Sequence, residues 1–327
     1  MNLPHGFTPV DLGILLSYRC QCACDHCLYN CGPSWEDWMQ PQELSACLQY
    51  VSRWTHPFQV HFTGGEPFLN FSLLLYGVEL AARLGIPSYV ETNAGWCLDE
   101  TLTMQRFEQL RTAGLGGVQI SCSPFHAAHI PLERTQRALG AAIQVFGMQR
   151  VWVYQGETLE FLRRFDANAC VPLPDSLAAL DGDGQQLWDG CGLIGGGRAG
   201  MRLGTLARRF PPGFFEWANC RPELTRSPHS HLDLYGNIIP GFCAGITLGD
   251  WRATAPAGEP AGREELLACL AESGPYGLYR LAAGEYTYRA LPDGYADKCH
   301  LCVHVRQHLH AAASFQSLAP AGFYHTI

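Results

Sequence analysis

The chain has 327 residues, 47% of them hydrophobic, and a formal net charge of −8 at pH 7. This acidic balance argues against a broad basic surface that binds duplex nucleic acid. No stretch reaches the ~18 uninterrupted apolar residues of a membrane span, and residues 1–19 lack a secretory signal pattern, so we expect a cytoplasmic protein with no membrane partner.

Short apolar runs alternate with helical patterns over the first 165 residues or so. The predicted strands are Leu12–Ser17, Phe58–Phe62, Ser88–Thr92, Val118–Cys122 and Val151–Tyr154. The predicted helices between them are Gln42–Trp54, Phe71–Leu84, Asp99–Ala113, Leu132–Phe146 and Thr158–Phe165. This alternation indicates parallel strands joined by crossover helices. Five or six such units are too few for a closed eight-fold barrel, so we expect an α/β fold built on an open partial barrel.

The pattern weakens further along the chain. Residues 174–201 are rich in Gly and Asp, which predicts a loop with one last strand near Cys191–Ile194. His231–Gly245 alternates around a Tyr-Gly-Asn turn and predicts a small hairpin, and residues 253–262 predict a flexible connection. Asp297–Ala312 predicts a helix that begins at a cysteine pair. We place a domain boundary near residue 205, which divides the chain into 1–205 and 206–327.

Fifteen cysteines are the unusual feature of the composition. In a reducing compartment, cysteines at short spacings are more often metal ligands than disulfide partners. Cys20, Cys24 and Cys27 form a CxxxCxxC triplet directly after the first predicted strand. Three thiolates on one tight loop can hold three irons of a [4Fe–4S] cube and leave the fourth iron open. A structural zinc site on Cys24 and Cys27 is the competing interpretation, and Cys22 or Cys31 could replace a ligand.

Further motifs stand at the ends of the next predicted strands. Gly64-Gly65-Glu66-Pro67 ends the second, where glycines let the backbone approach closely and a carboxylate can accept hydrogen bonds from an ammonium group. Thr92 and Asn93 end the third strand. Ser121 and Ser123 at the end of the fourth share one face, because alternate strand residues point the same way.

In this order the motifs resemble the radical S-adenosylmethionine (SAM) superfamily, whose CxxxCxΦC signature follows strand one of a partial (β/α)6 barrel. The resemblance implies a [4Fe–4S] cluster on Cys20, Cys24 and Cys27, with SAM chelating the open iron. Gly197-Arg198-Ala199 resembles a segment found late in such barrels, where Arg198 would pair with the SAM carboxylate through its bidentate fork. The residues that the resemblance implies in cofactor binding are His26, Gly64, Gly65, Glu66, Pro67, Thr92, Asn93, Ser121, Ser123 and Arg198.

A second group of cysteines follows the predicted barrel: Cys220, Cys243, Cys299 and Cys302. Their arrangement resembles the auxiliary-cluster domains called twitch and SPASM, which implies a second [4Fe–4S] cluster in a small α+β domain. Four protein ligands would leave no free iron, which suits electron transfer. A Cys₄ zinc site, or a role for Cys299 and Cys302 alone, remains open, and His308 is a further candidate ligand.

The resemblance implies an oxygen-sensitive enzyme that cleaves SAM reductively to a 5′-deoxyadenosyl radical, which abstracts a substrate hydrogen. We expect a two-electron oxidation or bond formation on a small molecule or peptide, and a flavodoxin- or ferredoxin-type electron donor. His126 is the candidate substrate-contacting or proton-shuttling residue, and Cys122 the candidate hydrogen donor or thioether former.

Three alternatives stay open. One is a peptide maturase that forms thioether or C–C crosslinks, although only 19 residues precede Cys20, which shifts the expectation toward a metabolite or protein side chain. Another is a single-cluster enzyme with redox-neutral chemistry and a structural zinc site. The third is a non-catalytic iron–sulfur or zinc scaffold, which the GGEP turn in register with the triplet argues against.

Overall fold

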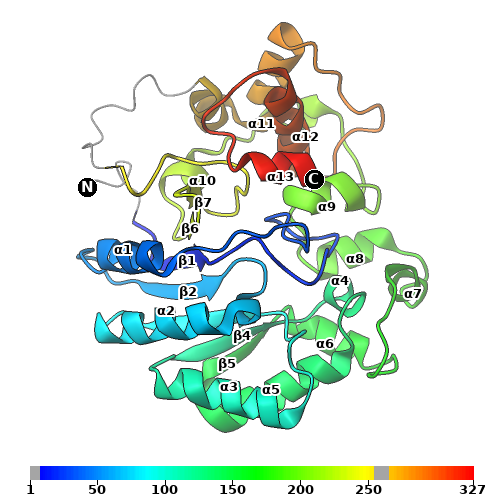
Figure 1. The fold of residues 1–327 in the computed structure, drawn as a ribbon. Coiled ribbons are helices and arrows are strands. Elements are labelled where there is room, and N and C mark those ends of the chain that lie inside the picture. Colours follow the sequence, from blue (N-terminus) through cyan, green and yellow to red (C-terminus); the bar gives the residue numbers. More distant parts are fainter. Residues whose placement is uncertain (1–7, 254–264) are drawn as a thin grey trace.

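The computed structural model describes residues 8–253 and 265–327, so the predicted flexible connection lies almost wholly outside the described part. A seven-stranded sheet with the order β5-β4-β3-β2-β1-β6-β7 forms the centre of the fold (Figure 1). Its strands are β1 (Asp11–Leu15), β2 (Gln59–Thr63), β3 (Ser88–Thr92), β4 (Gly117–Ser121), β5 (Val151–Tyr154), β6 (His229–Asp233) and β7 (Ile238–Pro240). Each neighbouring pair is parallel except β6 and β7, which form an antiparallel hairpin. The α/β class with parallel strands and crossover helices is confirmed.

The two faces of this sheet differ in chemistry because side chains alternate between them. One face carries fully buried aliphatic and aromatic residues: Leu12, Ile14, Val60, Phe62, Val90, Val118 and Ile120. Helices pack on this face, with α2 against β3 and α5 against β4 and β5. The other face carries the alternate residues of the same strands, many of them polar, and borders the site described below.

The helices of the first half follow the predicted rhythm. They are α1 (Pro41–Val51), the 3₁₀ turn η1 (Pro67–Asn70), α2 (Phe71–Arg83), α3 (Glu100–Thr112), α4 (Pro124–Ala127), α5 (Leu132–Phe146), the 3₁₀ turn η2 (Met148–Arg150) and α6 (Gly156–Leu162). Side chains cap some starts: Asp99 accepts from the Leu102 amide at 2.8 Å, and Asn70 from the Leu73 amide at 3.2 Å. The bounds of β3, β5 and α5 equal the predicted ones.

Two predictions for the following segment are wrong. Residues 174–201 are not one loop, because α7 (Leu173–Ala178), α8 (Gly184–Gly190) and the start of α9 (Gly197–Leu203) form there. Residues 191–194 are a turn after α8 and not a strand. The sixth parallel strand is β6, which pairs with the free side of β1. The glycines misled the prediction because all three helices are short, and α8 and α9 begin at glycines.

The remaining elements are mainly helical. They are η3 (Pro212–Phe215), α10 (Arg221–Thr225), α11 (Glu265–Glu285), α12 (Lys298–Ala312) and α13 (Ala321–Thr326). Figure 1 shows α11, α12 and α13 together at the end of the molecule away from α3 and α5. They enclose a second apolar cluster, which includes Leu270, Leu278, Leu301, Val305 and Leu309. Within the described ranges, no helix is both long and apolar enough to cross a membrane.

A buried hydrogen bond joins the loop after β1 to the β6–β7 turn. The Tyr18 hydroxyl donates to Asp233 Oδ2 at 2.8 Å, and both side chains are at most 1% exposed. Asp233 also accepts from the Tyr235 and Asn237 amides and from Asn237 Nδ2. The contact links segments on either side of residue 205, so the sheet and this bond cross the predicted boundary, which stays a prediction.

We expect Tyr18→Phe to lower the free energy of unfolding by about 1–3 kcal/mol, because it removes one of the two donors to the buried Asp233 Oδ2. Anaerobic urea unfolding followed by tryptophan fluorescence measures the change. Tyr76→Phe on α2, where the side chain is half-buried, is the control and should change stability by less than about 0.5 kcal/mol. Equal values for the two variants would contradict this role of Tyr18.

Candidate functional site

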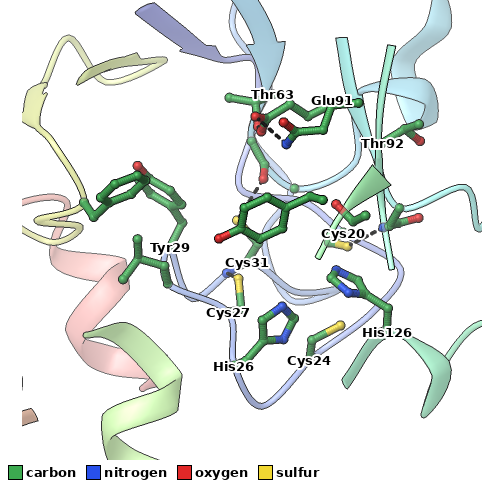
Figure 2. Close-up of a pocket in the computed structure, with 18 of the residues that line it drawn as sticks. Cys20, Cys24, His26, Cys27, Tyr29, Cys31, Thr63, Glu91, Thr92 and His126 are labelled. Atoms are coloured by element: carbon green, nitrogen blue, oxygen red, sulfur yellow. Dashed lines mark hydrogen bonds between the residues drawn. The ribbon is translucent and has the colours of Figure 1, made fainter. Parts of the chain in front are cut away.

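A cavity of about 420 Å³ runs along the polar face of the sheet and under the loop that follows β1. Its volume is in the range of small-ligand sites. The loop supplies the cysteines of the predicted triplet, and the strands supply polar side chains (Figure 2). The cavity therefore gathers residues from β1, β2, β3, β4, β5 and β6 at one site.

Cys20, Cys24 and Cys27 all line this cavity, together with Cys22 and Cys31. Two N–H groups point at the Cys20 sulfur: Asn93 Nδ2 and the Cys22 amide, each at 3.4 Å. The Cys31 amide donates to the Cys27 sulfur at 3.3 Å. Hydrogen bonds to sulfur stabilise thiolate ligands of iron–sulfur clusters, so this donor set fits such a cluster.

The thiols of Cys27 and Cys20 differ in acidity. A hydrogen bond from Cys31, opposed by burial and helped by the Arg198 guanidinium, lowers the pKa of Cys27 to about 6. The hydrogen bond with Cys22 and burial raise the pKa of Cys20 well above its usual value. A buried thiol of this kind becomes a thiolate when a cation binds beside it, as a cluster iron would.

The distances between the cysteine sulfurs can be compared with those expected around a zinc ion. Thiolates around one tetrahedral Zn²⁺ lie about 3.8 Å apart, given a Zn–S distance of about 2.3 Å. In the described ranges, no three of the chain's cysteine sulfurs lie within 4.8 Å of one another. A cube, in which each thiolate binds a different iron, does not require the sulfurs to approach so closely.

The glycines of the GGEP turn bring two backbones together. Gly64 and Gly65 line the cavity, and Gly64 has a φ of +129°, which favours glycine. A Cβ atom on Gly65 would overlap the carbonyl oxygen of Arg19, next to Cys20. The Gly65 amide donates to the Ser17 carbonyl at 2.8 Å. The turn thus sets the cysteine loop against the end of β2.

Glu66 does not point into the cavity. Its buried carboxylate accepts from Thr92 Oγ1 at 2.9 Å, the Asn93 amide at 2.8 Å and the Phe68 amide at 3.1 Å. Burial raises the pKa of Glu66 to about 7 against these three donors. Glu66 therefore ties the end of β2 to the end of β3, and Pro67 begins η1 beside it. This differs from the expected contact of its carboxylate with an ammonium group.

The other predicted residues of the strand ends separate into two groups. Thr92, Asn93 and Ser121 line the cavity. Ser123 is fully buried and caps α4, where its hydroxyl lies 2.8 Å from His126 Nδ1. The expected shared role of the two serines is therefore not seen, because the chain turns into α4 at Ser123.

His26 and His126 form one wall of the cavity (Figure 2). Their rings meet edge to face at 4.6 Å, and His26 stacks on Phe125 at 4.9 Å. Burial and the neighbouring His129 lower the pKa of His126 to about 4, so its imidazole is neutral near pH 7. A neutral imidazole can donate and accept a proton, and His126 is placed to contact a ligand.

Cys122 does not line the cavity, and its role as a hydrogen donor or thioether former stays a prediction. Cys122 lies in an apolar cluster with Ala127, Leu132, Leu159 and Leu162, on the face of the sheet away from the cavity. The reason is strand alternation, because Ser121 faces the cavity and its neighbour must face the other way. Burial also raises the pKa of Cys122 to about 11.

Arg198 lies behind the cysteine loop. Its guanidinium donates to the carbonyl oxygens of Cys24, at 2.7 Å, and Cys31, and its Nε donates to Asn30 Oδ1 at 3.0 Å. The Arg198 amide also donates to the Cys27 carbonyl at 3.0 Å. Arg198 is 3% exposed, so it holds the loop from within instead of pairing with a ligand carboxylate, as the sequence led us to expect.

The later cysteines come together from three parts of the chain. Cys220 precedes α10, Cys243 follows β7, and Cys299 and Cys302 lie in the first turns of α12. Burial and the neighbouring thiols raise the pKa of Cys243 to about 12 and that of Cys220 further. Burial, Asp297 and the same thiols raise the pKa of Cys299. The candidate ligand His308 instead has its Nε2 atom 2.6 Å from the Tyr286 carbonyl.

Sequence reasoning missed most of the polar face of the sheet. Asp11, Tyr29, Glu91, Gln119, Tyr154, His229 and His231 line the same cavity. Glu91 accepts from Thr63 Oγ1 at 2.7 Å and from Gln119 Nε2 at 2.9 Å, across three strands. The sequence does show polar residues at every second position of these strands. Without the strand order, however, it does not show that they lie together on one face.

Comparison with known proteins gives partial sequence matches. No protein-family model matches the chain. It is 23% identical over 119 residues to the putative peptide biosynthesis protein YydG of Bacillus subtilis (36% of this chain, 37% of the relative). It is 30% identical over 128 residues to a GTP 3′,8-cyclase of Mycolicibacterium smegmatis (38% and 34%). The chain thus matches about a third of the length of each relative. The structure of BtrN in complex with AdoMet and 2-DOIA aligns with a TM-score of 0.44 and 14% identity over 75% of this chain and 78% of BtrN.

We expect Arg198→Ala to destabilise the protein by about 3 kcal/mol or more, because it leaves three buried oxygens without charged donors. Iron per chain after anaerobic reconstitution should fall with it. Arg202→Ala is the matched control on the same helix, where a half-exposed ion pair to Asp25 at 2.8 Å contributes at most about 1 kcal/mol. Unchanged iron content in Arg198→Ala would show that the loop does not depend on this side chain.

We expect Gly65→Ala to lose iron because its Cβ displaces the backbone beside Cys20. Gly140→Ala on α5 is the control, since a Cβ there meets nothing within 4 Å, and it should stabilise the helix by about 0.5–1 kcal/mol. Iron analysis and thermal unfolding of both variants provide the comparison. Full iron content in Gly65→Ala would contradict the close approach of the two backbones.

Proposed function

Because this chain belongs with the radical SAM enzymes, we propose that it binds a [4Fe–4S] cluster through Cys20, Cys24 and Cys27 and cleaves SAM reductively. When bound, the cluster and SAM supply a 5′-deoxyadenosyl radical that abstracts a hydrogen atom from the substrate. The observation that carries the proposal is the shared cavity of these thiols with Gly64 and Gly65.

The residues around the cavity would have different roles, which depend on where each side chain lies. Asn93 donates to the Cys20 sulfur and orients it, while Arg198 holds the loop backbone. The cavity-lining backbone of Gly64 and the Ser121 side chain offer hydrogen-bonding groups to SAM. His126, held by Ser123, would contact the substrate or move a proton at its free ring nitrogen.

A second [4Fe–4S] cluster on Cys220, Cys243, Cys299 and Cys302 is part of the proposal. A substrate that has lost a hydrogen atom must give up one more electron to complete a two-electron oxidation or a new bond. Tyr29 lines the cavity and also packs against the apolar cluster that contains Cys220 and Cys302. A buried cluster there could accept that electron and pass it on, and we propose a flavodoxin- or ferredoxin-type partner for reduction.

The proposed substrate is a small molecule or a peptide. A peptide maturase that forms thioether or C–C crosslinks is the second candidate, and the similarity to a protein named for peptide biosynthesis favours it. The cavity of about 420 Å³ would be shared with the cluster and SAM, so what enters it from the substrate is small, such as a metabolite or one side chain of a peptide.

Iron and sulfide per chain after anaerobic reconstitution test both clusters. We expect roughly eight irons in the wild type, and about four in a Cys20/Cys24/Cys27→Ala variant and in a Cys299/Cys302→Ala variant. With dithionite as reductant, 5′-deoxyadenosine should form in the wild type, and not in the first variant. The second variant should still form it when no substrate is present, because cleavage needs only the first cluster.

The iron counts and the 5′-deoxyadenosine measurement distinguish the proposed enzyme from a single-cluster enzyme and from a non-catalytic scaffold. About four irons in the wild type that fall to none without Cys20, Cys24 and Cys27 would indicate one cluster, redox-neutral chemistry and zinc or nothing at the later cysteines. Two clusters without any 5′-deoxyadenosine would favour a non-catalytic scaffold and overturn the proposed activity.

A further inference from the structure

Three histidines face one another on the polar face of the sheet, beyond the cysteine loop. The strand register places them there: Gly13 on β1 stands opposite His61 on β2 and His231 on β6. Asp11, two residues before Gly13, stands opposite His229. All of these residues share one face because side chains alternate along a strand.

The ring nitrogens of the three histidines are close enough to bind one ion. One nitrogen from each of His61, His229 and His231 lies within 4.8 Å of the other two. A tetrahedral ion with Zn–N bonds of about 2.0–2.1 Å would require them to lie about 3.3 Å apart, so the rings would move closer together when an ion binds. It is the one group of three or more potential ligands at this spacing in the described residues.

His61 supplies an independent observation. Its side chain is fully buried, yet its Nε2 atom has no hydrogen-bond partner. Glu91 Oε1 lies 3.8 Å away, beyond hydrogen-bonding distance. A buried polar atom without a partner costs about 1–3 kcal/mol, so an unpaired Nε2 beside two other imidazoles indicates a ligand.

Gly13 leaves room for the His231 ring and for the approach of His61 over β1. A Cβ atom at this position would overlap the His231 ring and lie 2.7 Å from both His231 Nε2 and His61 Nε2. The φ of Gly13 is not positive, so the glycine is explained by this space and not by its backbone conformation. The two Nε2 atoms therefore converge over a strand residue that has no side chain.

The ring nitrogens of His61 and His231 that face away from the trio also have hydrogen-bond partners, as the histidine ligands of metal sites do. His61 Nδ1 lies 2.9 Å from Asp11 Oδ1, and the Tyr89 hydroxyl donates to Asp11 Oδ2 at 2.9 Å. The Tyr29 hydroxyl oxygen lies 2.7 Å from His231 Nδ1 and 3.2 Å from His231 Nε2. A carboxylate that accepts from one ring nitrogen fixes the tautomer and leaves the other nitrogen's lone pair free for a metal.

We propose that His61, His229 and His231 bind a divalent first-row transition metal ion, such as Zn²⁺, separate from the iron–sulfur clusters. Three imidazoles with a further open position are a known catalytic-zinc arrangement. His229 and His231 line the same cavity as Cys20, Cys24 and Cys27, so the open position faces the ligand space. An oxygen or nitrogen donor of the substrate would occupy it and be held in place opposite the cysteine loop.

The test uses the full chain with its clusters reconstituted, incubated anaerobically with one equivalent of Zn²⁺ and desalted. Elemental analysis counts zinc, and zinc K-edge X-ray absorption identifies its ligands. We expect about one zinc per chain with nitrogen or oxygen neighbours at about 2.0–2.1 Å and no sulfur at about 2.3 Å. His61→Gln and His229→Gln should lose the zinc. Asp11→Asn should weaken binding about 10–100-fold, because it acts on the orientation of His61.

His126→Gln is the matched control, since His126 lies in the same cavity outside the trio and should keep the zinc. Iron per chain reports folding, so if the buried His61 variant loses iron, the half-buried His229 decides. Sulfur neighbours in the wild type would place zinc at cysteines and overturn the proposal. So would an absence of bound zinc, or zinc retained in His229→Gln. None of these outcomes depends on SAM cleavage, which the 5′-deoxyadenosine measurement tests by itself.

Discussion

The buried guanidinium of Arg198 is the contact on which the site depends. A loop that carries five cysteines after β1 leaves many backbone carbonyls away from water, and each needs a donor. Arg198 supplies donors to the carbonyls of Cys24 and Cys31 and to Asn30, from a helix far along the sequence. Its charge is balanced by these oxygens, and a bound thiolate cluster would balance it further.

Glu66 is the second such support, at the opposite side of the loop. Its hydrogen bonds from Thr92 and Asn93 connect the ends of β2 and β3, and Asn93 donates to the Cys20 sulfur. The GGEP turn therefore acts through two different groups. Its glycines face the cavity, while its carboxylate holds the neighbouring strand in place.

The cavity on the polar face of the sheet has two ends, which carry different kinds of metal-ligand atoms. Thiols suited to iron lie in the loop, and imidazoles suited to zinc lie along β2 and β6. Between them stand Thr63, Glu91 and Gln119, hydrogen-bonded to one another across three strands. A substrate in this space would contact both ends, with polar side chains to select it.

The sequence by itself determined the parallel α/β fold, the bounds of β3, β5 and α5, and the cysteine triplet and GGEP turn at strand ends. These are local properties, because apolar periodicity, turn glycines and short spacings act within a few residues. Only the tertiary structure decided that β6 joins β1, that Arg198 and Glu66 support the loop, and that Cys122 faces away. It also decided that His61 meets His229 and His231, about 170 residues away. Strand order and register bring such residues together, and neither can be read from one segment alone.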